Sequence, residues 1–212
     1  MTHHTLMRRR MKRLPLLIFP VVAILLLTAT PAIAHNSTIT APNGRSPFYS
    51  GYKFRLSGNH YGQGTHTEAN GHDANDYYAL DLNPIIPDGG SPCNRKVLPL
   101  WDNLKVTYVH TDSGFLRMEG RVNGGRSHQL EYRHLNRIYV KTNDVVGKST
   151  VVGLVGDKGR SSSCHLHLSI RARFSSSESE HARHGHPLWS RRPFICGSEV
   201  PNDKSLQLPG CY

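Results

Sequence analysis

One segment near the C-terminus carries two histidines in a pattern that can do chemistry, Ser161-Ser-Ser-Cys-His-Leu-His-Leu-Ser-Ile170. If this segment is a strand, alternate side chains point to opposite faces, so His165 and His167 share one face. Two imidazoles this close can act on the same small group, and a divalent metal with its activated water is such a group. The alternative is a solvated strand face, because a His-x-His motif alone is short and unspecific.

Three further segments carry histidine, aspartate or glycine in suggestive settings. Gly71–Leu82 places His72 in a loop and Asp81 late in a strand, and Glu131–Leu135 puts His134 in a strand. The third is a glycine-rich run, Val151-Val-Gly-Leu-Val-Gly-Asp-Lys-Gly159, directly before the His-x-His segment. Taken alone, each residue has an ordinary structural role, such as a histidine bonded to a backbone carbonyl or an aspartate at a strand end.

The elements that must position these residues are short strands. The sequence shows no long apolar stripe with a period of 3.6 residues, and glycine-rich turns separate short apolar or alternating runs. This pattern predicts an all-β fold, an antiparallel sandwich or barrel-sandwich hybrid with few or no helices. The predicted strands are Tyr77–Leu82, Leu104–His110, Phe115–Val122, His128–Leu135, Arg137–Val140, Val151–Val155 and His165–Arg173.

The N-terminus has the three parts of a secretory signal peptide. A basic segment (Arg8–Arg13) precedes an apolar run (Leu14–Leu27) and a small-x-small cleavage site (Ala32–Ala34). The alternative is an uncleaved anchor, but the run is shorter than the ~20 residues that a membrane span needs, and Pro20 interrupts it. We therefore predict cleavage of residues 1–34, a secreted or cell-wall-associated protein, and no stable membrane insertion.

The remaining chain is predicted to have two parts. Residues 35–71 form a polar segment, rich in glycine and asparagine, that wraps around the domain or is partly loose. Residues 72–212 form the domain itself, with a C-terminal extension and a polar insertion at 174–186. The four cysteines of an exported protein predict disulfides. Three pairings are possible; linking Cys196 to Cys211 closes a short loop, which leaves Cys93 with Cys164.

The charge of the exported chain is mildly positive. Removing the signal peptide's five Lys and Arg from the total of 26 leaves 21 basic against 15 acidic residues, a formal net charge of +6. This suits an anionic polymer such as a bacterial cell wall, although a soluble domain can carry it by chance. No basic run with interleaved aromatic residues occurs, so nucleic acid is not an expected partner. We expect a monomer.

The order of the motifs resembles the lysostaphin-like zinc endopeptidases, which cut peptides of bacterial peptidoglycan. The resemblance runs from about residue 72 to 173: Tyr-Ala-Leu-Asp, Tyr-x-His-Leu, Val-Val-Gly-x-x-Gly-x-x-Gly and His-x-His. It implies that an early histidine, Asp81 and His167 bind zinc. The family usually has this histidine four residues before the aspartate, where this chain has Tyr77. We assign His72, the nearest to Asp81; His66 and His60 are its rivals.

The resemblance also assigns His134 and His165 as the two catalytic histidines that do not bind the metal. They would orient the water, take its proton and stabilise the oxyanion. The predicted function is therefore a secreted zinc endopeptidase acting on peptidoglycan peptides. Two alternatives remain: a catalytically silent domain that binds the wall or activates amidases, and a metallopeptidase of the same architecture that acts on proteins. The departure at Tyr77 is the feature that favours the silent domain.

Overall fold

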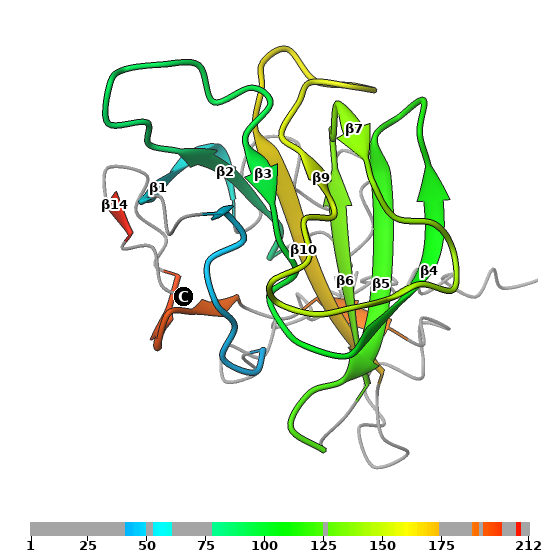
Figure 1. The fold of residues 1–212 in the computed structure, drawn as a ribbon. Helices are drawn as coiled ribbons and strands as arrows, with labels where there is room; N and C mark the ends of the chain where they lie inside the picture. Colours follow the sequence, from blue (N-terminus) through cyan, green and yellow to red (C-terminus); the bar gives the residue numbers. More distant parts are fainter. Residues whose placement is uncertain are drawn as a thin grey trace, which may run out of the picture. The chain divides into compact units, whose positions relative to one another are not determined.

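A computed structural model describes residues 41–49, 53–60, 78–124, 127–173, 188–190, 193–200 and 207–208, all within one compact unit, Asn36–Tyr212 (Figure 1). The predicted signal peptide, the polar insertion, His66 and His72 lie outside these residues. In the described part of the chain, no helix has the length and apolarity needed to cross a bilayer.

The fold is dominated by one large sheet. Its strands follow the spatial order β14 (Gln207–Leu208), β1 (Phe54–His60), β2 (Leu80–Pro84), β10 (Leu166–Arg173), β6 (Ser127–Arg133), β5 (Phe115–Arg121), β4 (Leu104–His110) and β8 (Val145–Val146). A further strand, β11 (Leu188–Ser190), pairs with β10. Every pairing between these strands is antiparallel. The all-β prediction is confirmed.

Two smaller sheets accompany the large one. The first joins β3 (Lys96–Val97), β9 (Gly153–Leu154) and β7 (Arg137–Ile138), and the second joins β12 (Phe194–Ile195) and β13 (Ser198–Glu199). A single apolar cluster unites residues of the large sheet with Val97, Val152 and Val155 around the three-stranded sheet. The buried Tyr132 hydroxyl donates to the carbonyl of Leu98, 2.8 Å away, and ties β6 to the segment after β3.

Alternation along β10 separates the core from the functional face. Leu166, Leu168 and Ile170 are fully buried in the core cluster, and each such side chain contributes about 1.5–3 kcal/mol. The residues between them, His167 and Ser169, therefore point to the other face of the sheet. This local pattern is what places the second histidine of the His-x-His motif.

Several predicted elements need correction. Leu104–His110 is a strand with the predicted bounds, whereas β6 ends at Arg133, so His134 lies in the turn beyond it. Asp81 is the second residue of β2 and does not come late in the strand. The segment predicted to wrap around the domain supplies β1, which pairs with β2, and its Phe54 is buried. The alternation of Tyr52, Phe54 and Leu56 with polar residues is a strand signal in the sequence that the prediction missed.

Candidate active site

The site is built first from two adjacent strands. Asp81 on β2 lies directly opposite His167 on β10 in the antiparallel register. His167 Nδ1 lies 3.1 Å from Asp81 Oδ1, and both residues are buried. Residues paired across strands present their side chains on the same face, so the register itself brings this imidazole to this carboxylate.

His165 reaches the same carboxylate from the residue before β10. Its backbone forms a bridge to Gly156, and its Nε2 lies 3.3 Å from Asp81 Oδ1. The other ring nitrogen, Nδ1, lies 2.9 Å from the carbonyl oxygen of Ser163 and 3.3 Å from Ser161 Oγ. Because a carbonyl oxygen only accepts, Nδ1 carries the hydrogen and Nε2 is directed toward Asp81. The expectation that His165 and His167 share one face is confirmed.

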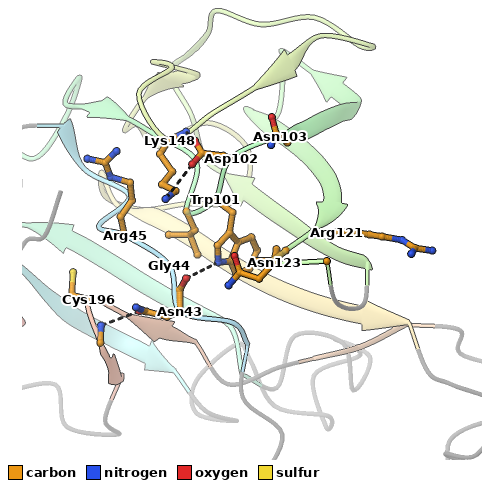
Figure 2. Close-up of a pocket in the computed structure, with 14 residues that line it drawn as sticks. Asn43, Gly44, Arg45, Trp101, Asp102, Asn103, Arg121, Asn123, Lys148 and Cys196 are labelled. Atoms are coloured by element: carbon orange, nitrogen blue, oxygen red, sulfur yellow. Dashed lines mark hydrogen bonds and ion pairs between the residues drawn. The ribbon is translucent and has the colours of Figure 1, made fainter.

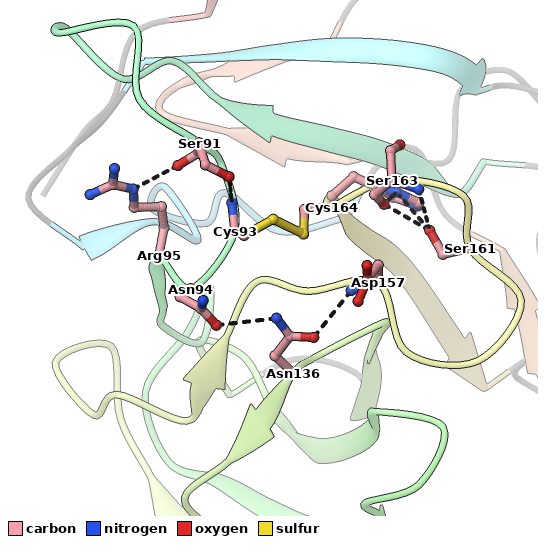
Figure 3. Close-up of a disulfide and its surroundings, with 10 residues drawn as sticks. Ser91, Cys93, Asn94, Arg95, Asn136, Asp157, Ser161, Ser163 and Cys164 are labelled. Carbon is pink, nitrogen blue, oxygen red and sulfur yellow. Dashed lines mark hydrogen bonds between the residues drawn. A yellow bond between two sulfur atoms is a disulfide. The ribbon is translucent and has the colours of Figure 1, made fainter.

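A disulfide holds the loop that carries His165. Cys93, in the segment after β2, is bonded to Cys164, the residue directly before His165 (Figure 3). Nearby, Asn136 Nδ2 donates to Asn94 Oδ1 at 3.1 Å, which ties the turn after β6 to the Cys93 segment. The predicted Cys93–Cys164 pair is confirmed. Cys196 is also disulfide-bonded, and its predicted partner, Cys211, lies outside the described residues.

His134 completes the group from a third direction. It follows β6 with a φ of 68°, and its neighbour Leu135 donates its N–H to the carbonyl of Gly114 at 3.0 Å. His134 Nδ1 donates to the Lys158 carbonyl at 2.7 Å, which leaves Nε2 as the acceptor nitrogen. Its ring centroid lies 4.8 Å from that of His165 and 5.9 Å from that of His167.

The surroundings shift the pKa values of His134 and His165, which we call the two outer histidines, in opposite directions. Burial acts to raise the pKa of the Asp81 carboxyl, but hydrogen bonds from His165 and His167 outweigh it and hold this pKa well below its usual range. Burial lowers the pKa of His134 to about 4, so its ring is neutral at pH 7. For His165, burial acts to lower the pKa, but the Asp81 carboxylate raises it above 6.5.

The donor set fits a zinc ion as far as it is described. Two tetrahedral zinc ligands with bonds of about 2.0–2.1 Å lie about 3.3 Å apart, and Asp81 Oδ1 and His167 Nδ1 are 3.1 Å apart. The predicted third ligand, His72, lies outside the described residues. Within the described ranges no cluster of three or more His, Cys, Asp or Glu side chains is arranged to hold a metal ion.

A separate cavity of about 740 Å³ lies around Trp101, Asn43, Arg45 and Lys148 (Figure 2). None of the four clustered residues lines it. Trp101 is buried and its Nε1 donates to the carbonyls of Pro42 and Asn43, so its ring is part of the core. Because the convergent polar and titratable side chains lie elsewhere, size alone does not make this cavity the active site.

Comparison with known proteins identifies the segment that holds the three histidines. Residues 102–180 match the model of peptidase family M23. The match to this family covers about a third of the chain. The resemblance drawn from the motif order is thereby confirmed, and the M23 match includes His134, His165 and His167 but not Asp81. No curated protein matches the chain.

Several solved peptidase structures are similar to this chain. The catalytic domain of lysostaphin from Staphylococcus simulans is 22% identical over 59% of this chain and 85% of its own, with a TM-score of 0.39. The catalytic domain of EnpA from Enterococcus faecalis is 22% identical over 44% and 66%, with a TM-score of 0.36. A putative M23 peptidase from Pseudomonas aeruginosa is 20% identical over 63%, with a TM-score of 0.41, and the chain spans about half of that protein, 47%.

Sequence reasoning missed the residues that orient the histidines. The carbonyl of Ser163 orients the ring of His165, and the carbonyl of Lys158 orients the ring of His134. Because every residue has a backbone carbonyl, the sequence gives no signal for these contacts. It also missed Arg133, which lies directly opposite His167 on β6. The alternation of Gln129, Glu131 and Arg133 along the predicted strand was a signal that would have found it.

Proposed function

We propose that this protein is a zinc-dependent endopeptidase that hydrolyses peptide bonds of bacterial peptidoglycan. The observation that carries the proposal is the convergence of Asp81, His134, His165 and His167 from separate segments onto one small volume. The match of residues 102–180 to a peptidase family supports hydrolysis of peptide bonds. The mildly basic exported chain and the disulfides suit an extracellular wall polymer.

Each residue then has a defined part. His72, Asp81 and His167 would hold the zinc ion, which supplies an activated water and a polarised carbonyl when bound. His134, neutral at pH 7 with Nε2 as an acceptor, takes the proton of the water and returns it to the leaving amine. His165, whose pKa the Asp81 carboxylate raises against the effect of burial, donates from Nε2 to the developing oxyanion in its protonated form, while its Nδ1–H is bonded to the Ser163 carbonyl.

One observation favours the catalytically silent alternative. Tyr77 stands where the family usually has the first histidine ligand, and a chain without that ligand would bind wall material without cutting it. The four described residues oppose this alternative, because a silent domain has no need to keep both outer histidines with Nδ1 bonded to carbonyls.

The test uses the exported chain, residues 35–212, prepared with its disulfides formed. Its zinc content is measured, and purified peptidoglycan is digested and the released fragments are analysed by mass. We expect one zinc per chain and fragments that arise by cleavage of peptide bonds. Asp81→Asn should lose both properties, whereas Asp102→Asn, which alters a carboxylate paired with Lys148 outside the site, should lose neither. Zinc binding without any cleavage would establish the silent alternative.

A further inference from the structure

The face of the large sheet that carries the active site continues past it toward β4. His167 pairs with Arg133, so this arginine lies beside the candidate metal ligands. One step further along the strands, Ser169 on β10 pairs with Glu131 on β6, Glu131 with Arg117 on β5, and Arg117 with Tyr108 on β4. These side chains form a second row beside the histidines, which we call the arginine shelf: Tyr108, Phe115, Arg117, Glu131, Arg133 and Arg171.

The centre of the arginine shelf is a fully buried carboxylate. Glu131 Oε1 accepts from Arg117 Nε at 2.9 Å, while Oε2 accepts from Arg171 Nη2 at 3.0 Å and from Arg133 Nη2 at 3.3 Å. Burying a carboxylate is costly unless strong hydrogen bonds compensate it. Three guanidinium partners provide that compensation, and in return Glu131 fixes the orientation of each of them.

Aromatic rings hold the outermost of these arginines. The guanidinium carbon of Arg117 lies 5.4 Å from the ring centroid of Phe115 and 5.9 Å from that of Tyr108. The two rings are themselves 5.6 Å apart, and Tyr108 is 45% exposed. Contacts of this kind hold a cation in place without using its hydrogen-bond donors. Arg117 is therefore oriented by Glu131 on one side and by the rings on its faces.

The remaining donors of Arg117 are presented to solvent. Its side chain is 34% exposed, and within the described part of the chain its only side-chain hydrogen bond runs through Nε to Glu131. A guanidinium has a second edge, formed by its two terminal nitrogens, that binds a carboxylate with two parallel hydrogen bonds. Glu119, the next residue of β5 on this face, lies opposite Lys105 and accepts a hydrogen bond from Gln129. Its contacts are therefore with these residues and not with the second edge of Arg117.

We propose that the arginine shelf is a specificity subsite, in which Arg117 binds a free carboxylate of the substrate peptide. The inference rests on the proposed function and names its substrate class: a wall peptide with an acidic group close to the scissile bond. β5 lies two strands from β10, about 10 Å at the usual strand spacing, and Arg117 lies two residues, about 7 Å, along the strands from the row of His167. An extended peptide covers the resulting distance of about 12 Å in roughly four residues. The carboxylate therefore lies roughly four residues from the bond that is cut.

The test compares two forms of the same substrate. Purified peptidoglycan is used untreated and after carbodiimide coupling to ammonia, which converts its carboxylates to amides, and the release of new amino groups is followed. The wild-type exported chain should cleave the untreated form about 10- to 100-fold faster, the size expected for a hydrogen bond to a charged group. Arg117→Gln should cleave both forms at the rate that the wild type shows on the amidated form.

The matched control is Arg137→Gln. Arg137 is also an exposed arginine over an aromatic ring, 5.3 Å from the centroid of Tyr139, but it lies on β7 of the smaller sheet. This variant should keep the wild-type preference. If Arg117→Gln does not fold, Arg117→Lys is the substitute, because lysine keeps the charge but cannot form the bidentate pair with a carboxylate. Arg117→Lys should lose most of the preference for the untreated substrate.

The outcomes separate this inference from the proposed function. Equal wild-type rates on the two substrates, or an unchanged preference in Arg117→Gln, would show that the shelf only stabilises the sheet and would overturn the inference. If the wild type cleaves neither substrate, the proposed function fails. Calorimetric binding of untreated and amidated wall peptides to the zinc-loaded protein then decides the inference: tighter binding of the untreated peptides upholds it and equal binding rejects it.

Discussion

The imidazole rings of His134 and His165 lie 4.8 Å apart between centroids, and each donates Nδ1–H to a backbone carbonyl. Both rings therefore direct Nε2 away from the backbone, His165 toward Asp81 at 3.3 Å. This arrangement separates the two outer histidines from His167, whose Nδ1 faces the carboxylate. Histidine is thus held in two orientations, one that suits the proposed metal ligand, His167, and one that suits the proposed catalytic residues, His134 and His165.

The first prediction separates metal binding from chemistry. His167→Ala should lose both zinc and activity, because it removes a ligand. His134→Ala and His165→Ala should keep most of the zinc and lose about 10²- to 10⁴-fold in rate, the usual size of a general acid–base contribution. Metal content and wall-peptide turnover are measured on the same preparations. A His165→Ala protein without zinc beside a zinc-loaded His167→Ala protein would reverse the assignment.

The second prediction concerns the first zinc ligand, which lies outside the described residues. His72 is close in sequence to Asp81, so His72→Ala should abolish tight zinc binding while His66→Ala should not. Zinc affinity is measured by competition with a chelating dye. Loss of zinc in His66→Ala with retention in His72→Ala would transfer the role to His66.

The third prediction concerns the turn that holds His134. Gly114 has a φ of 65°, and a Cβ atom there would come within 3.0 Å of backbone atoms of Leu135 and His134. Gly114→Ala should therefore destabilise the fold by more than 1 kcal/mol, about the cost of a positive φ alone, and displace His134 with loss of rate. Gly124→Ala is the control, because Gly124 also has a positive φ but no atom within 4 Å of the added Cβ. In the control, turnover should stay at the wild-type rate and the free energy of unfolding should fall only by the roughly 1 kcal/mol that the positive φ costs. Equal effects in both variants would show that no contact restrains the turn.

The fourth prediction concerns the disulfide beside His165. Replacing Cys93 and Cys164 together by alanine should reduce the free energy of unfolding by about 2–5 kcal/mol, and the loop that orients His165 should loosen. Chemical denaturation measures the first effect and turnover the second. Peptide mapping of the unreduced protein checks the pairing, and a Cys164–Cys196 link would contradict it.

The fifth prediction concerns the buried Tyr132. Burial raises the pKa of its hydroxyl well above 10, so the unfolded chain ionises first as pH rises. Tyr132 therefore contributes its full stability below about pH 10 and loses it progressively above that value. Tyr132→Phe should cost about 1 kcal/mol at pH 7 through loss of the bond to Leu98, and the difference from wild type should shrink at alkaline pH. A constant difference from pH 7 to 11 would contradict this.

Local patterns in the sequence were enough to predict part of this protein. Alternation in His165–Arg173 correctly predicted that the two histidines share a face, because a strand's period of two depends only on the strand itself. The motif order was enough to indicate the peptidase family. The cysteine count and the short loop between Cys196 and Cys211 led to the correct Cys93–Cys164 pair.

Tertiary structure decided the rest, because strand register joins residues that are far apart in the chain. The pairing of β10 with β2 and β6 sets Asp81 and Arg133 on either side of His167. His134 lies just beyond β6 with a positive φ, Leu135 is bonded to Gly114, and the Lys158 carbonyl orients the His134 ring. Register also gathers three arginines around Glu131 and brings Phe54 into the core. Each of these depends on a neighbouring strand that the local sequence does not contain.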